Sequence, residues 1–246
     1  MVGPLEIFVA DYETGDFSQW GHCQSAVLNG DCTEVDGSHR SMQIVEDPDM
    51  HRGRYAARFA VHKGDIPEFG GGERSEVAAG DDEQADTREG DERWYEWSMR
   101  FPENFENPTG NWFIVMQWHA GEGGSPPLTI NISDDGTVDI AGDGTDEPEQ
   151  TIGPVRRGEW TDYVLHAKFS ADHDTGFVEA WENGEQTVPK TARQTMTSDN
   201  NDLKMGIYRD EDAGDGPAEV LFSGLRVTGP ARAAAVAVTT GRDDRS

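Results

Sequence analysis

The sequence lacks any long apolar run, and no stretch approaches the ~18 apolar residues that a membrane-spanning helix needs. Its first residues, MVGPLEIFVADYETGD, do not place a cationic segment before a long apolar one, so no signal peptide is visible. Either export is not used or a leader has been removed. Amphipathic helical patterns of about ten or more residues are also missing. We therefore expect no membrane partner and little helix.

Lysine is scarce as well. Lys63, Lys168, Lys190 and Lys204 are the only four among 20 Lys plus Arg, against 48 Asp plus Glu and a net charge of −28. Such a surface repels nucleic acid and anionic membranes, so neither is an expected partner. Many carboxylates with few lysines favour a protein kept soluble in high salt, where self-repulsion is screened. An ordinary acidic secreted protein is the alternative.

Cys23 and Cys32 are the only cysteines, and no zinc-ligand set accompanies them. They lie close together in SQWGHCQSAVLNGDCTEVDG, which has the composition of a loop. In an exported protein they can form a disulfide, and two free thiols are the alternative.

What the chain does contain is a series of short runs rich in β-branched and aromatic residues, separated by turn signals such as Asp135-Gly136 and Asn183-Gly184. The first strand is expected within DYETGDFSQW. The charged segment 81–93 reads as a solvated loop. This pattern predicts an all-β fold, a two-sheet antiparallel β-sandwich of the jelly-roll, concanavalin-like type. We expect one domain over residues 1–230 and a flexible tail over 231–246.

The stretch 111–120, NWFIVMQWHA, is the most strand-like of these runs. Strict alternation places Ile114, Met116 and Trp118 on one face, which we expect to face the core. The opposite face then carries Phe113, Val115, Gln117 and His119. An amide and an imidazole therefore point the same way at its end.

Two further stretches pair an apolar face with a polar one. In GGERSEV, Arg74 and Glu76 project together, and in LKMGIYRD the shared face holds Lys204, Gly206 and Tyr208. If the three strands are neighbours, their polar side chains meet around a glycine. Taken singly, each has a structural reading: a surface ion pair, a structural histidine, a packed tyrosine or an edge-strand lysine.

In this order, Arg-Ser-Glu, Gln-Trp-His and Lys-Met-Gly-Ile-Tyr-Arg resemble the heparin lyase I-type family of polysaccharide lyases, which includes compact glucuronan lyases. More distantly they are similar to jelly-roll alginate lyases. DYETGDFSQW and FVEAWENGEQ also fit, so the resemblance spans roughly residues 10 to 228. It implies cleavage of a uronic-acid polysaccharide by β-elimination.

Elimination requires the uronate carboxylate to be offset before the weakly acidic proton beside it can leave. Arg74 and Gln117 suit that role. The resemblance implies His119 as base and Tyr208 as acid, or Tyr208 in both roles when proton and leaving group lie on the same side. Lys204 would lower the pKa of the phenol or bind the uronate.

The remaining assignments are substrate contacts and partners. Glu76 is expected to orient Arg74, and His62 is a reserve candidate for substrate contact or base. The chemistry requires no cofactor, although the resemblance allows a structural calcium, for which no contiguous ligand pattern is present. We expect a secreted monomer whose partner is an acidic polysaccharide.

Two rival functions use the same fold. A glycoside hydrolase needs two carboxylic acids facing the scissile bond, and the β-glucanase pattern Glu-x-Asp-x-x-Glu does not occur in the sequence. A non-catalytic carbohydrate-binding domain needs exposed aromatics but no Lys-x-x-x-Tyr set. We favour a lyase acting on a glucuronan-like polymer, with alginate, heparin-type and ulvan-type polymers open.

Overall fold

The computed structural model describes residues 4–35, 38–80, 85–121 and 123–230. The predicted tail, 231–246, lies outside the described residues, as do 81–84 of the predicted charged loop. One short 3-10 helix, η1 (Cys32–Glu34), is the sole helical element of the described part, and no helix there has the length and apolarity to cross a bilayer. The expectation of an all-β protein is confirmed.

The strands form two sheets. The β9 sheet contains β1 (Leu5–Ala10), β4 (Ser38–His39), β5 (Met42–Glu46), β6 (Tyr55–Val61), β9 (Glu92–Arg100), β14 (Trp160–Lys168), β15 (Phe177–Glu182), β16 (Glu185–Ala192) and β18 (Ala218–Gly229). The β10 sheet contains β2 (His22–Ser25), β3 (Asn29–Asp31), β7 (Glu73–Ala78), β8 (Thr87–Arg88), β10 (Phe113–Ala120), β11 (Leu128–Ile132), β12 (Thr137–Ala141), β13 (Gln150–Pro154) and β17 (Asn200–Arg209).

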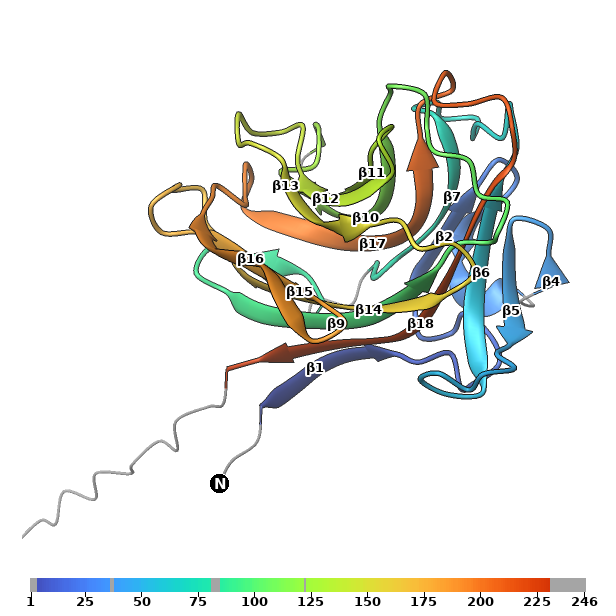
Figure 1. Ribbon diagram of the computed structural model, residues 1–246, viewed down its shortest axis with the longest axis horizontal. Helices are drawn as coiled ribbons and strands as arrows, with labels where there is room; N and C mark the ends of the chain where they lie inside the picture. The colour runs from blue at the N-terminus through green and yellow to red at the C-terminus, as the bar shows by residue number, and fades with distance from the viewer. Residues whose placement is uncertain (1–3, 36–37, 81–84, 122, 231–246) are drawn as a thin grey trace, which may run out of the picture.

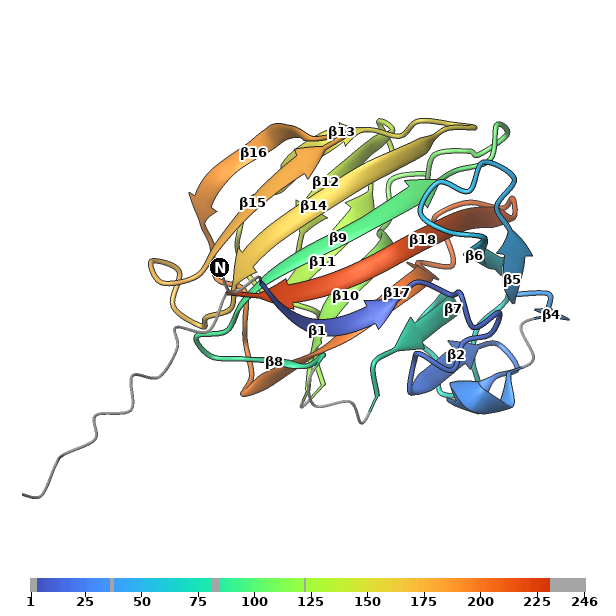
Figure 2. The ribbon, with the colours of Figure 1, turned by 90° about the horizontal axis from the view of Figure 1, so that it is seen from below.

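All strand pairs are antiparallel, and the order β13-β12-β11-β10-β17-β7-β2-β3 places β10 and β17 in the middle of the β10 sheet. Figure 1 shows this sheet curving away from the β9 sheet, so that its outer face is concave. Viewed from below in Figure 2, the long strands of the β9 sheet cross in front of β10, β11 and β17. The two-sheet jelly roll predicted from the sequence is confirmed.

The core fills the space between the sheets. Trp97 and Tyr95 of β9 and Trp118 of β10 are fully buried, and the rings of Tyr95 and Trp118 meet edge to face at 4.8 Å. Large aromatic side chains bury much apolar surface each, so these contacts between sheets account for a large part of the packing energy. They also hold β10 firmly, which matters because this strand carries candidate site residues on its other face.

The predicted faces of β10 are correct only for its second half. A β-bulge between Ile114 and Met116 interrupts the alternation. Phe113 and Val115 therefore join the core, while Ile114 pairs with Tyr208 on the concave face. The expectation that Ile114 shares the face of Met116 is wrong, because an extra residue in a bulge shifts the face of every residue before it.

Three other expectations also needed correction. The first strand is Leu5–Ala10, because Tyr12 takes a left-handed backbone (φ 61°) and leaves the sheet. The region around the cysteines is not a plain loop: β2 and β3 lie there, and Cys23 and Cys32 form a buried disulfide. In the charged segment, Thr87 is fully buried where β8 pairs with β17.

Candidate active site

Strands β7, β17 and β10 lie side by side, which meets the condition under which their polar faces come together. In register, Tyr208 pairs with Arg74, Gly206 with Glu76, and Lys204 with Gln117. Residues that pair directly across adjacent strands point to the same face of a sheet. The polar sides of the three predicted stretches therefore share the concave face.

Gly206 makes this close approach possible. Its φ of +142° is one that residues with a side chain rarely adopt, and an added Cβ would lie 2.2 Å from the backbone oxygen of Ser75. β17 contains one more residue than β10 at this point, since the register shifts between Ile114 and Met116. Gly206 therefore lies where the register shifts, between Lys204 and Tyr208, and has no side chain that would clash there.

Arg74 is nine-tenths buried and lies against an aromatic surface. Its guanidinium carbon is 3.8 Å from the centre of the Tyr208 ring and 5.5 Å from that of Phe69. Nη1 lies 3.5 Å from a carboxylate oxygen of Glu76 and donates to Oε1 of Gln24 at 3.3 Å. Nε has no hydrogen-bond partner among the described residues, which leaves a buried donor for a ligand.

Glu76 and Gln117 form the floor beneath Arg74. Nε2 of Gln117 donates to Oε1 of Glu76 at 2.6 Å, and both side chains are almost completely buried. Glu76 therefore contacts both the cation and the amide, and its role in orienting Arg74 stays a prediction. Oε1 of Gln117 remains without a partner among the described residues.

The half-buried imidazole of His119 is arranged to accept a proton. Its Nδ1 lies 2.9 Å from the backbone oxygen of Ala120. Because a carbonyl can only accept, Nδ1 carries the hydrogen and Nε2 keeps a free lone pair. Burial, then the charge of Lys204 and to a smaller extent that of Arg74, lower the pKa of His119 to about 4. The imidazole is therefore neutral near pH 7.

Tyr208 lies between the Trp112 ring, the Arg74 guanidinium and a glycine-rich loop. The Trp112 ring centre is 4.4 Å from that of Tyr208, and the phenol donates weakly to the backbone oxygen of Gly71 at 3.5 Å. A Cβ on Gly71, whose φ is +101°, would lie 3.2 Å from the phenol oxygen. The hydroxyl is thus held at the surface of the concave face, and Gly71 is its one weak hydrogen-bond partner within the described part of the chain.

Lys204 faces a residue that the sequence reasoning missed. Asp202 precedes it by two positions, pairs with His119 across the strands, and lines a small pocket with Lys204. Burial raises the pKa of Asp202 to about 6, opposed by Lys204 and reinforced by Asp86 and Glu76. The alternation that places Lys204 and Tyr208 on one face also places Asp202 there, so the sequence could have indicated this residue. Gln24, the partner of Arg74, had no such signal, because β2 was read as a loop.

His62 stands apart from this cluster. It follows β6 of the other sheet, its side chain is about half exposed, and Nδ1 lies 3.2 Å from Asp65. Its contacts among the described residues do not reach His119 or Tyr208, so its substrate role stays a prediction. Within the described ranges, no group of three or more His, Cys, Asp or Glu is arranged to hold a metal ion, and the calcium expectation also stays untested.

The concave face thus brings a neutral imidazole, a phenol and two cations together, and the family of the chain comes from comparison with known proteins. A family model described as polysaccharide lyase matches residues 12–226. The chain belongs to this polysaccharide lyase family. The lyase matches no protein among curated sequences.

Solved structures share the fold of the lyase over most of its length. Endo-β-1,4-glucuronan lyase from the fungus Trichoderma reesei is similar with a TM-score of 0.64 and 17% identity, covering 91% of this chain and 95% of that one. The family 7 alginate lyase AlgAT5 gives 0.57 and 17%, covering 85% and 94%.

A glycoside hydrolase family 131 catalytic domain from Coprinopsis cinerea gives a TM-score of 0.59 and 14% identity, covering 91% and 94%. At such identities these likenesses establish the fold alone. A hydrolase among the neighbours means that the chemistry of the lyase has to be argued from its site.

Proposed function

We propose that this lyase cleaves a uronic-acid-containing polysaccharide by β-elimination on the concave face of the β10 sheet. The observation that carries the proposal is the neutral His119, with a free Nε2, on the same face as Arg74 and Tyr208. Because His119 is already neutral beside Lys204 and Arg74, it can accept a proton at pH 7 without first having to release one of its own.

The uronate carboxylate binds at Arg74 and Gln117. The unpartnered Nε of Arg74 and the one Nε2 hydrogen of Gln117 that is not donated to Glu76 supply donors, and Glu76 contacts both groups. These donors act where negative charge develops when the neighbouring proton leaves, so they stabilise the enolate-like transition state. Lys204 adds a second cation close to His119.

The proton transfers then balance. His119 takes the proton from the carbon beside the carboxylate, the electron pair forms the carbon–carbon double bond, and the bond to the glycosidic oxygen breaks. The Tyr208 hydroxyl donates its proton to that oxygen. One fragment ends in an unsaturated uronate and the other in a new hydroxyl group.

A hydrolase mechanism finds less support in the same residues. Glu76 is 1% exposed and bonded to Gln117, so it is not presented to a glycosidic bond. Among the described residues that line its small pocket, Asp202 has no second carboxylic acid opposite it. Two carboxyl groups facing one bond are what hydrolysis requires.

A β-linked glucuronan is the first polymer to test. It is the substrate named for the fungal enzyme whose fold covers nearly the whole chain. Alginate, heparin-type and ulvan-type polymers belong in the same panel. The Cys23–Cys32 disulfide supports a secreted enzyme, because such bonds persist in oxidising compartments.

The test is the ultraviolet absorbance of the unsaturated product over this panel, with each polymer also supplied after chemical reduction of its carboxyl groups. We expect absorbance to rise with at least one uronate polymer and not with its fully reduced counterpart. New reducing ends without unsaturated product would indicate hydrolysis and overturn the proposal.

A further inference from the structure

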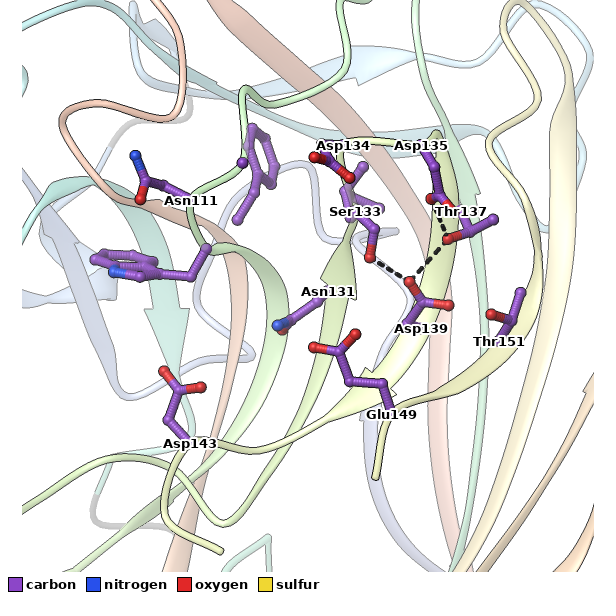
Figure 3. A pocket seen from close by; sticks show the side chains of 14 residues that line it. Asn111, Asn131, Ser133, Asp134, Asp135, Thr137, Asp139, Asp143, Glu149 and Thr151 are labelled. Atoms are coloured by element: carbon purple, nitrogen blue, oxygen red, sulfur yellow. Dashed lines mark hydrogen bonds between the residues drawn. The ribbon is translucent and has the colours of Figure 1, made fainter. Parts of the chain in front are cut away.

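A second cavity opens on the concave face, on the β10–β13 side of the candidate active site. It has a volume of about 400 Å³, and the described residues that line it include five carboxylates but no Lys, Arg or His. Of the five carboxylates, Asp134, Asp135 and Asp139 belong to the β11–β12 hairpin, whereas Asp143 follows β12 and Glu149 precedes β13. Figure 3 shows them around the opening together with Asn131 of β11. We call it the acidic pocket.

The acidic pocket is continuous with the site of the proposed elimination. One cross-strand row runs through successive pairs over the concave face: Arg74, Tyr208, Ile114, Asn131, Asp139 and Thr151. Trp112 lines the acidic pocket and its ring centre also lies 4.4 Å from that of Tyr208. Adjacent strands are about 4.8 Å apart, so Asp139 is roughly 14 Å from Tyr208 along the row. A polymer lying along this row reaches both places.

Asp139 gives the acidic pocket its chemical character. The residue is 3% exposed, and one oxygen, Oδ2, accepts from the hydroxyls of Ser133 and Thr137. Its other oxygen, Oδ1, has no partner among the described residues, and neither has Oδ1 of Asn131. Figure 3 shows Asp139 pointing from β12 into the opening. A buried charged acceptor without a donor is costly, so the pocket favours a ligand that supplies donors.

We infer that the acidic pocket is a subsite for a sugar unit that lacks a carboxylate and donates hydrogen bonds through its hydroxyls. A uronate there would place its charge among five carboxylates, with no cation among the described lining residues to offset it. The preferred polymer therefore carries a uronate at the cleaved position and a neutral sugar a few units away. This inference rests on the proposed elimination and narrows its substrate class to mixed polymers.

The test uses the polymer of the panel that yields most unsaturated product, after partial chemical reduction of its carboxyl groups. Linkage stays constant, and uronates and neutral sugars are randomly mixed. Mass spectrometry of the oligosaccharide products then shows where neutral sugars lie relative to the unsaturated non-reducing end of one fragment and the new reducing end of the other. We expect about tenfold enrichment of neutral sugar at one fixed position, the factor that a charged hydrogen bond supplies.

Three variants refine the result. Asp139→Asn should lose most of the enrichment, whereas Glu185→Gln, which removes one exposed charge from the other sheet, should keep it. Asp139 also braces the hairpin, so its thermal unfolding is compared with wild type. Asn131→Asp adds a negative charge to the pocket and leaves the hydrogen bonds from Ser133 and Thr137 to Asp139 intact, so it should raise the enrichment.

Two failures are distinguishable. If no polymer gives unsaturated product, the proposed elimination is wrong. If product forms but neutral sugars are randomly placed, or if Asp139→Asn and Asn131→Asp leave their placement as in wild type, the subsite inference alone is overturned.

Discussion

The low pKa of His119 leads to a specific prediction for the pH dependence of the lyase. Burial comes first among the causes that lower it to about 4, and the charge of Lys204 comes second. As base, the imidazole must be neutral. At pH 5 a group with a pKa of 4 is about 90% neutral, whereas an ordinary histidine with a pKa of 6.5 is only about 3% neutral. The wild-type enzyme should therefore keep most of its kcat/KM at pH 5.

The decisive variant is Lys204→Met, which removes the charge and keeps much of the side-chain volume. Its acid limb should move upward from about 4 but stay below 6.5, because burial remains. Lys168→Met, on β14 of the other sheet, is the matched control and should leave the limb unchanged. The assay measures kcat/KM from product absorbance at steps of about half a pH unit between about pH 3.5 and 8. Each profile is normalised to its own plateau.

Two results would refute this reasoning. A wild-type acid limb at or above pH 6.5 would mean that His119 is not the base or is not shielded from water. An unchanged limb in Lys204→Met would mean that the lysine is not close to the titrating group. Lower activity in Lys204→Met does not affect either reading, because only the position of the limb is compared.

Four further predictions follow from the same structure. Tyr208→Phe keeps the stacked ring and removes the proton donor, so kcat should fall by about 10²–10⁴ with little change in KM, and a near-normal kcat would exclude the acid role. Asp202 has its pKa raised from 3.8 to about 6, so its favourable contribution to stability is present at low pH and is lost as pH rises through about 6. Asp202→Asn should therefore gain more unfolding free energy relative to wild type at pH 8 than at pH 4 in denaturant titrations, and equal gains contradict this. Cys23→Ala/Cys32→Ala opens a loop of sequence separation 9 and should cost roughly 2–3 kcal/mol of unfolding free energy, a loss that reductant should reproduce in the wild type. Initial rates should rise with salt, since a net charge of −28 repels a polyanion until the Debye length falls from about 10 Å at 0.1 M to 3 Å at 1 M, and a steady decline from low salt counts against it.

The central part of the site was predictable because it depends on alternation alone. Arg74 and Glu76, Gln117 and His119, and Lys204 and Tyr208 each lie two or four residues apart, and an even spacing keeps side chains on one face of a strand unless a bulge intervenes. In β17 the irregularity falls at Gly206, which has no side chain to misplace.

The rest depended on contacts between distant segments. The bulge that moves Ile114 to the concave face arises from pairing with two neighbours, and the residues of β10 alone do not reveal it. Gln24 reaches Arg74 only because a disulfide and β7 hold β2 in the sheet. The acidic pocket was hidden for a similar reason, because the hairpin at Asp135-Gly136 was predicted while the neighbour of its outer strand, β13, was not.

The position of Asp202 beside Lys204 affects how tightly the enzyme can hold its polymer. Above pH 6 the cluster contains two cations, Arg74 and Lys204, and two anions, Glu76 and Asp202, so it offers a polyanion no net attraction. Below pH 6 Asp202 takes up a proton and one positive charge becomes uncompensated. His119 stays neutral down to about pH 4. Mildly acidic solution is therefore the medium in which capture of the polymer and removal of its proton should be favoured together.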